Sequence, residues 1–286
     1  MKDMINLLRC SVCKGILAQE DACVRCCSCD VSYRFIENVP DMLPSRLSQD
    51  INNSVSGWEE INYAYDLHID DTPKERLLAI DEPLLNIVKG KVLEVGCGTA
   101  RLHTEVSKKG CDYTGIDPSR KLLKQGYRKG VRELVRGVGE YLPFPDNHFD
   151  TIIGGYHSFR YIDLEKGFTE CARVLKPGEM FAFTLWNYWS LNIHASLGDI
   201  KNMRLPKPFP FQKKDIICND VSWVKNEIRV LHKAGFNVMS LLSTKKLPLQ
   251  RFSFLKKIAN WNGYWHGTLG AFIGYDIIFI CRNEKL

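Results

Sequence analysis

The chain of 286 residues is 45% hydrophobic and 25% charged, the balance of a globular protein with one large or two unequal domains. No apolar run reaches the roughly 18 residues of a membrane-spanning helix, and the charged start MKDMINLLR is too short for a secretory signal, so we expect a cytoplasmic protein. The net charge of +6 is uneven, because residues 201–286 carry 15 basic and 5 acidic side chains and the remainder is at −4.

The first segment with a chemical pattern is a cluster of cysteines, six of the 11 in the chain, within residues 10–29. Two Cys-x2-Cys knuckles about a dozen residues apart have the spacing of a zinc ribbon, in which four thiolates surround one structural ion. Cys23 with Cys26 offers another knuckle and Cys27 is spare, so spacing alone leaves the register open. Disulfides are not expected in a chain without a secretory signal.

The residues after the cluster favour one register. The run DVSYRFIENVPDML (30–43) resembles the ending of small zinc-ribbon modules. In that register residues 1–45 form the ribbon, and a structural Zn²⁺ supplies the stability that a piece of roughly 40 residues cannot obtain from its own core. The metal ligands that the resemblance implies are Cys10, Cys13, Cys26 and Cys29.

Residues 46–70 are predicted to hold a linker and a short helix that precedes the main domain. The stretch 44–57 is polar and weakly patterned, as linkers are, whereas WEEINYAYD (58–66) is expected to be helical. From residue 73 to 88, apolar residues recur at helical spacing and proline stands near the start, which predicts a helix packed on a sheet.

Beyond residue 90, strands and helices alternate, which is typical of a parallel sheet with helices on its faces. The expected strands are 91–95, 112–117, 132–136, 149–155, 179–185, 236–243 and 277–281. The expected helices are 100–109, 119–129, 164–174 and 220–234. Two inserts, about 187–218 and 247–275, interrupt the alternation, and the prolines of LPKPFPF (205–211) predict a shaped loop in the first.

The first of these strands runs into a glycine loop, VLEVGCGTARL at residues 92–102. Glycine lacks a Cβ, so the backbone can turn tightly and approach a ligand. Loops that bind dinucleotides carry a further glycine where this chain has Arg101. The carboxylate of Glu94, just ahead of the loop, suits a cationic ligand better than a pyrophosphate. The loop therefore indicates a nucleotide-type fold with a different cofactor.

This acidic glycine loop resembles motif I of class I S-adenosylmethionine-dependent methyltransferases of the type 11 kind. Four more segments match that family in order: YTGIDPS (113–119), LPFPDNHFD (142–150), VLKPGE (174–179) and AGF (234–236). The resemblance implies an α/β, Rossmann-like sheet, mostly parallel with its last strand antiparallel, next to the small N-terminal zinc ribbon. It also implies that the methyltransferase domain spans 71–286 and that the two inserts form a lid over the substrate.

The same resemblance assigns the binding of S-adenosylmethionine. Asp117 would bind both ribose hydroxyls and Pro118 would pack near the adenine. Tyr65 would close over the cofactor, or else only anchor its helix to the core. The residues assigned to the cofactor are Tyr65, Glu94, Gly96, Cys97, Gly98, Asp117, Pro118, Gly139, Glu140, Tyr141, Gly155 and Tyr156.

His157, after the fourth strand, is the candidate catalytic residue, since an unperturbed imidazole can exchange a proton near neutral pH. A base is needed only if the acceptor keeps its proton until the transition state. We favour the alternative that His157 merely packs against the cofactor. An Asn-Pro-Pro-Tyr motif is absent here, where GGYH (154–157) stands instead, which disfavours methylation of a base or a glutamine nitrogen.

Three functions remain open at this point. The favoured one is methylation of a small-molecule or lipid-like acceptor, which could be anionic because the basic C-terminal part carries many aromatic residues. The second is RNA methylation with the ribbon as recognition module, but residues 1–45 hold 5 basic and 6 acidic side chains, which is no basic platform. The third, a non-catalytic binding protein, is disfavoured because the acidic glycine loop and Asp117 are retained.

Overall fold

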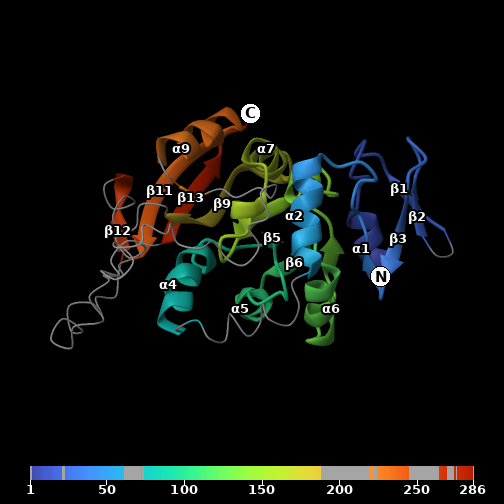
Figure 1. Cartoon of the computed structure of the whole chain (residues 1–286), viewed down its shortest axis with the longest axis horizontal. Coiled ribbons are helices and arrows are strands. Elements are labelled where there is room, and N and C mark those ends of the chain that lie inside the picture. The colour runs from blue at the N-terminus through green and yellow to red at the C-terminus, as the bar shows by residue number, and fades with distance from the viewer. Residues whose placement is uncertain are drawn as a thin grey trace, which may run out of the picture.

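The computed structural model describes residues 2–20, 23–60, 72, 74–187, 220–221, 224–244, 264–268, 274 and 276–285. The chain forms a small N-terminal sheet and a large mixed sheet, and Figure 1 shows helix α2 (Gln49–Glu60) between the small sheet and the centre of the large one in this view. Tyr65 and nearly all of the two inserts lie outside the described residues. Among the residues described, no helix is both long and apolar enough to cross a bilayer.

The N-terminal module, residues 2–43, begins with α1 (Lys2–Leu7) and continues as an antiparallel sheet whose strands pair in chain order. Its strands are β1 (Leu17–Gln19), β2 (Cys23–Cys26), β3 (Ser32–Ile36) and β4 (Val39–Pro40). Leu8, Val24 and Tyr33 form the centre of its small interior. So few apolar side chains bury little surface, which is why such modules need an additional source of stability.

The large sheet has the strand order β12-β11-β13-β9-β8-β5-β6-β7. These strands are β5 (Lys91–Val95), β6 (Asp112–Asp117), β7 (Leu134–Arg136), β8 (Phe149–Gly154), β9 (Leu175–Asn187), β11 (Phe236–Thr244), β12 (Tyr264–His266) and β13 (Asp276–Asn283). Five neighbouring strands of the sheet, β9, β8, β5, β6 and β7, are parallel to one another. Strand β13 runs antiparallel to both its neighbours. The expected fold class, with its last strand antiparallel, is confirmed.

Helices cover both faces of this sheet and bury two apolar clusters. On one face lie α4 (Lys74–Leu85), α5 (His103–Lys108) and α6 (Arg120–Arg128), and on the other lie α7 (Leu164–Val174) and α9 (Val224–Lys233). The second face holds stacked phenylalanine rings, with Phe183 at 4.9 Å from Phe181 and 4.8 Å from Phe279 between ring centroids. These rings are fully buried, so apolar burial dominates the stability of this part of the molecule.

Three elements differ from the sequence-based expectation. The stretch 44–57, expected to be a linker, contributes most of α2. The helix expected at 220–234 begins only at Val224, because residues 220–221 form β10 (Asp220–Val221), a short strand beside β9. The fifth strand is longer than 179–185, since β9 extends from Leu175 to Asn187.

The N-terminal module packs against the β7 edge of the large sheet. Asp41 pairs with Arg136 as a parallel β-bridge, and the Met42 N–H donates to the Arg136 carbonyl at 2.8 Å. On the other side of the junction, the Lys14 ammonium contacts the Glu170 carboxylate at 2.7 Å. The module therefore covers an edge that would otherwise expose unpaired backbone groups.

Candidate functional site

A cavity of about 270 Å³ opens at the carboxyl ends of the central strands. Gly96 follows β5, Asp117 ends β6, Gly155 follows β8 and Trp186 lies near the end of β9, and all four line the cavity. The chain leaves β5 toward β6 on one side and toward β8 on the other, so this is the point where strand order reverses. Open α/β sheets bind ligands at such a point because the loops diverge there and leave a crevice.

The glycine loop forms one wall of the cavity. Gly96 and Gly98 have φ angles of +73° and +55°, in the left-handed region that favours glycine. A Cβ at Gly96 would lie 2.4 Å from the Cβ of Ser158, so no larger residue fits. Arg101, in place of a further glycine, forms an ion pair with Asp81 on α4. The loop is thus shaped to bring backbone to the cavity.

Asp117 presents its carboxylate at the neighbouring strand end. Oδ2 accepts the Gly98 N–H at 2.8 Å and Oδ1 accepts the Ser119 N–H at 2.9 Å. Burial raises the pKa of Asp117 to about 6, although these two hydrogen bonds oppose the rise. A carboxylate can accept about four hydrogen bonds, so each oxygen keeps a lone pair for a ligand. Asp117 can therefore hold a pair of adjacent hydroxyl groups.

Two hydroxyl groups in the wall indicate that the cavity is built for a polar ligand. Ser54 and Ser158 both line it, and their Oγ atoms are buried without a hydrogen-bond partner among the described residues. An unpaired buried hydroxyl costs roughly 1 to 3 kcal/mol. A bound ligand that supplied the partners would remove that cost. These orphaned atoms, with Asp117, fit the amino-acid and ribose parts of S-adenosylmethionine.

Helix α2 supplies a wall that the sequence analysis did not foresee. Ile51, Ser54, Val55 and Trp58 all face the cavity, a turn or more before the expected Tyr65. Ile51, Val55 and Trp58 recur at i, i+4 and i+7, the spacing of one helical face. That spacing could have revealed the helix, but the polar residues between them hid it.

Most, but not all, of the expected cofactor residues line the cavity. Those that line the cavity are Gly96, Gly98, Asp117, Pro118, Gly139, Glu140, Gly155 and Tyr156. Glu94, Cys97 and Tyr141 are missing from the described residues of the wall. Glu94 instead accepts the Tyr113 hydroxyl at 2.6 Å beneath the loop, and burial raises its pKa to about 8.

Glu140 lines the cavity but its carboxylate has a structural partner. Its Oε1 accepts the Asp163 N–H at 2.8 Å, which joins two loops. Burial raises the pKa of Glu140 to about 7.

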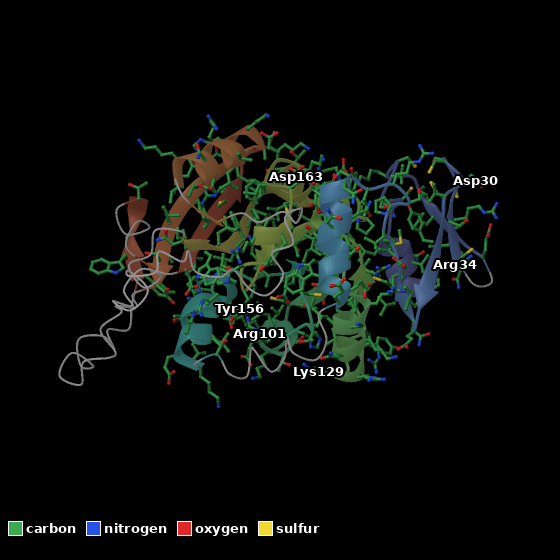
Figure 2. All side chains as sticks on the ribbon, viewed as in Figure 1. Asp30, Arg34, Arg101, Lys129, Tyr156 and Asp163 are labelled. Atoms are coloured by element: carbon green, nitrogen blue, oxygen red, sulfur yellow. The ribbon has the colours of Figure 1, made fainter. Side chains whose placement is uncertain are left out.

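Figure 2 shows Tyr156 and Arg101 in the large domain, well away from Asp30 and Arg34 of the N-terminal module.

His157 lies at the end of the cavity nearest β9. Its backbone has a φ of +63°, and its N–H donates to the Thr184 Oγ1 at 2.7 Å. The ring stacks on Trp186, with centroids 6.1 Å apart. Its Nε2 lies 2.9 Å from Oδ1 of Asp276, a residue that the sequence analysis did not single out.

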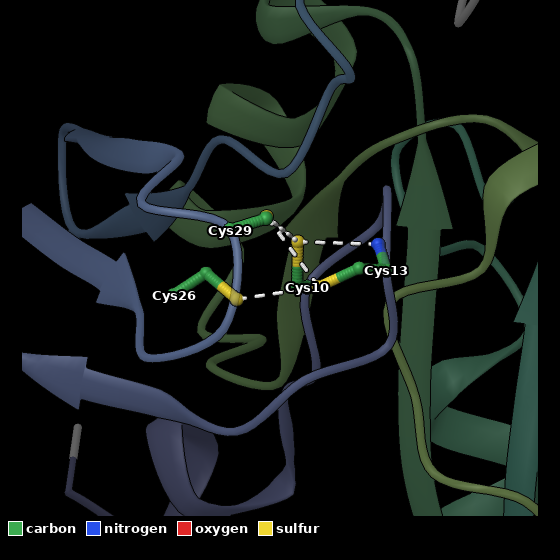
Figure 3. Close-up of side chains that lie close together, drawn as sticks. All are labelled: Cys10, Cys13, Cys26 and Cys29. Atoms are coloured by element: carbon green, nitrogen blue, oxygen red, sulfur yellow. Dashed lines mark hydrogen bonds between the residues drawn. The ribbon is translucent and has the colours of Figure 1, made fainter.

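The four expected metal ligands meet in the N-terminal module, and Figure 3 shows their sulfur atoms turned toward one another. All four sulfurs lie within 4.8 Å of one another, with Cys13 at 3.4 Å from both Cys26 and Cys29. Tetrahedral zinc with Zn–S bonds of about 2.3 Å requires sulfurs about 3.8 Å apart, so this donor set fits the ion.

The neighbouring cysteines stand apart from this group. Cys23 is directed to the Glu20 carboxylate at 3.5 Å and Cys27 is exposed. The Tyr33 hydroxyl contacts the Cys10 sulfur at 3.1 Å, as outer-shell partners of metal ligands do. The structure therefore brings together the sulfurs of Cys10, Cys13, Cys26 and Cys29, which is one of the two ligand sets that spacing had left open.

Comparison with known proteins agrees with this geometry. Residues 93–183 match the sequence model of a family described as methyltransferase domain. The matched residues make up less than half of the chain, and it is this stretch that resembles the family. A solved S-adenosylmethionine-dependent methyltransferase from Thermotoga maritima shares its fold, at 19% identity and a TM-score of 0.58, over 81% of this chain and 100% of that one. The expected kinship with S-adenosylmethionine-dependent methyltransferases is confirmed.

Curated relatives match this chain over part of their length. A demethylmenaquinone methyltransferase from Corynebacterium kroppenstedtii is 40% identical over 88 residues, or 31% of this chain and 38% of that protein. A fatty-acid O-methyltransferase from Mycolicibacterium smegmatis is 35% identical over 103 residues, or 34% of this chain and 38% of that protein. The chain thus spans well under half the length of these two relatives.

Proposed function

We propose that this protein transfers a methyl group from S-adenosylmethionine to a small, lipid-like acceptor, and that its N-terminal module holds a structural Zn²⁺. The observation that carries the proposal is Asp117 at the strand-order reversal, with a free lone pair on each oxygen beside the glycine loop. A ligand with two adjacent hydroxyls and a nearby charged amino-acid group fits that arrangement.

The cofactor half of the cavity would be formed by β5, β6 and α2. Asp117 would hold the ribose, the glycine loop would contact the methionine part, and Ser54 and Ser158 would gain their missing partners. The bound cofactor would supply an activated methyl group. The protein's own contribution is then to align the acceptor with that methyl and to exclude water.

The acceptor half is apolar and aromatic, which favours a lipid-like molecule. Its walls include Trp58 against Tyr161, with ring centroids 5.0 Å apart, and Trp186 under the Arg160 guanidinium at 4.8 Å. Aromatic walls suit a flat or hydrocarbon acceptor. Demethylmenaquinone and fatty acids, the acceptors named for the two relatives, are therefore the first molecules to test.

Calorimetry with S-adenosylhomocysteine tests the cofactor half directly. We expect binding to the wild type and a loss on the order of 100-fold in Asp117→Ala, since two charge-assisted hydrogen bonds disappear. Asp112→Ala, at the opposite and exposed end of β6, is the matched control and should bind normally. Failure of the wild type to bind would refute the proposal.

Transfer of labelled methyl to reduced demethylmenaquinone, to palmitate and to total RNA tests the acceptor half. Product from either lipid-like molecule supports the proposal. Methylation of RNA alone, or tight RNA binding with a steep salt dependence, would replace it with the RNA function.

A further inference from the structure

A buried carboxylate at the acceptor end of the cavity has a full set of donors. Asp276 begins β13 and its side chain is only 1% exposed. Arg76 of α4 contacts it with two nitrogens, at 2.8 and 3.3 Å, and the Thr244 hydroxyl donates to Oδ2 at 3.0 Å. Burial alone would raise the pKa of Asp276, but hydrogen bonding by His157 and the charge of Arg76 hold it well below its usual range. The carboxylate is therefore ionised.

This ionised carboxylate decides the tautomer of His157. A carboxylate accepts hydrogen bonds and donates none, so the Nε2 atom of His157, 2.9 Å from Asp276 Oδ1, must carry a hydrogen. In a neutral imidazole with Nε2 protonated, Nδ1 holds a lone pair. Within the described part of the chain, no hydrogen-bond partner of Nδ1 is found. The ring thus offers a base on the atom that the protein leaves unoccupied.

The position of this base suits the reaction. His157 follows β8, which is two strands from β6, so it lies about 10 Å from the Asp117 end of the cavity. It lines the cavity together with Trp186 and Arg76. The groups that face it are therefore Asp276 from β13, Arg76 from α4, Tyr156 from its own loop, and Trp186, which carries Arg160 on its ring. Asp276 offsets the charge of Arg76 beside it.

We propose that Asp276 is a positioning residue that holds His157 as the general base, and that the acceptor is therefore a hydroxyl compound such as a phenol or hydroquinone. This inference rests on the proposed function and narrows its acceptor. The acceptor O–H bond breaks and its proton passes to Nδ1. The electron pair left on the oxygen forms the bond to the transferred methyl, and the sulfur keeps the pair of the broken C–S bond. Asp276 stabilises the resulting imidazolium. A carboxylate acceptor would need no such base.

Nitrogen-15 spectra of histidine-labelled protein with S-adenosylhomocysteine test the tautomer without turnover. We expect neutral His157 to carry its hydrogen on Nε2, and Asp276→Asn to abolish the single tautomer. A hydrogen on Nδ1 of the neutral ring would overturn the inference. Absence of S-adenosylhomocysteine binding by the wild type would instead refute the proposed function.

Kinetics with reduced demethylmenaquinone and with palmitate separate a base from a merely structural histidine. We expect His157→Gln and Asp276→Asn to lower kcat for methylation of the hydroquinone oxygen about 100-fold or more and to flatten its rise with pH. A product methylated only on a ring carbon would overturn the inference. Binding of S-adenosylhomocysteine should stay within threefold. His148→Gln, at the opposite end of β8, is the matched control. Unchanged kcat in His157→Gln, or wild-type transfer to palmitate alone, would overturn the inference even if Asp276→Asn fails to fold.

Discussion

The N-terminal module and the large domain differ in the groups that are expected to stabilise them. The module has four short strands and places four cysteine sulfurs within 4.8 Å of one another. The large domain has stacked, fully buried phenylalanines on one face of its sheet and a second apolar cluster on the other. A sheet of a few short strands cannot bury enough surface alone. The module's buried side chains, among them Leu8 and Val24, join the apolar cluster on one face of the large sheet, and we expect a metal held by the four cysteines to add the stability that this burial does not supply.

Metal removal should produce the largest effect and only in the module. We expect one zinc per chain, because four cysteines form one candidate site. The effect should be large because structural zinc contributes about 10 to 16 kcal/mol to folding. Chelation or Cys26→Ser should abolish hydrogen-exchange protection in β1 to β3 while β5 and β8 stay protected. Cys27→Ser, the exposed neighbour, is the control and should retain the metal. A protein that keeps its module ordered without metal would contradict the comparison.

Truncation in the phenylalanine stack should have the next largest effect and should act on the large domain. Phe183→Ala removes a fully buried ring that contacts Phe181 and Phe279. We expect a loss of about 3 to 5 kcal/mol in unfolding free energy, measured by denaturant titration. Leu78→Ala, at a side chain that is 65% exposed, should change it by less than about 0.5 kcal/mol. Zinc release reports unfolding of the module. If Phe183→Ala and Leu78→Ala release zinc at the same denaturant concentration, the module unfolds separately from the large domain.

Lowering the pH should stabilise the large domain around Glu94 and weaken metal binding in the N-terminal module. Burial raises the folded-state pKa of Glu94 from 4.5 to about 8, so between these values the folded carboxyl is protonated while the unfolded one is ionised. Stability from this group is therefore complete below its unfolded pKa and is lost as pH rises through 8. The module's thiolates bind metal less well in acid.

Comparison of wild type with Glu94→Gln isolates this carboxyl. Between pH 5 and 8, we expect the unfolding free energy of the wild type to fall by about 2 to 3 kcal/mol relative to that of Glu94→Gln, since each pKa unit can contribute at most about 1.4 kcal/mol. Thermal unfolding at a series of pH values measures it, in chelated and zinc-loaded protein. A difference between the two proteins that does not change with pH would rule out the raised pKa.

The sequence was sufficient where the determinants lie close together in the chain. The glycine loop and Asp117 belong to adjacent strand ends, and each strand is marked by its own apolar run. The same holds for the cysteines, whose two knuckles are short local patterns. The alternation of strands and helices predicted a parallel sheet, and the family resemblance of these local motifs implied the fold class, the cofactor residues at the strand ends and the set of cysteines that the structure brings together.

The remainder depends on contacts that no local pattern reveals. Asp276 meets His157 across 119 residues of sequence, through the antiparallel insertion of β13 beside β9. Nothing about Asp276 in the sequence distinguishes it from any acidic residue that begins a strand. Helix α2 was missed for another reason: its exposed face is so polar that Ile51 and Val55 did not stand out as a stripe.

The smallest expected effect tests whether the two regions act independently. Arg136 joins them: its guanidinium contacts Asp41 of the module at 2.7 Å and Glu59 of α2 at 2.8 Å, and its Nε donates to the Pro118 carbonyl at 3.0 Å. Pro118 follows Asp117 in the cavity wall, so the module reaches the proposed cofactor site through one side chain.

Arg136→Met should therefore weaken both stability and ligand binding. We expect a loss of about 1 to 2 kcal/mol of unfolding free energy, since two carboxylates and a carbonyl lose a partner. Binding of S-adenosylhomocysteine should weaken about fivefold, because a displacement of Pro118 disturbs the proposed ribose site. Arg120→Met removes an exposed contact to the same Glu59 and should leave both unchanged. Equal behaviour of the two variants would mean that the module and the cavity are independent. Weaker binding in Arg136→Met alone would mean that this contact between the module and Pro118 supports the proposed cofactor site.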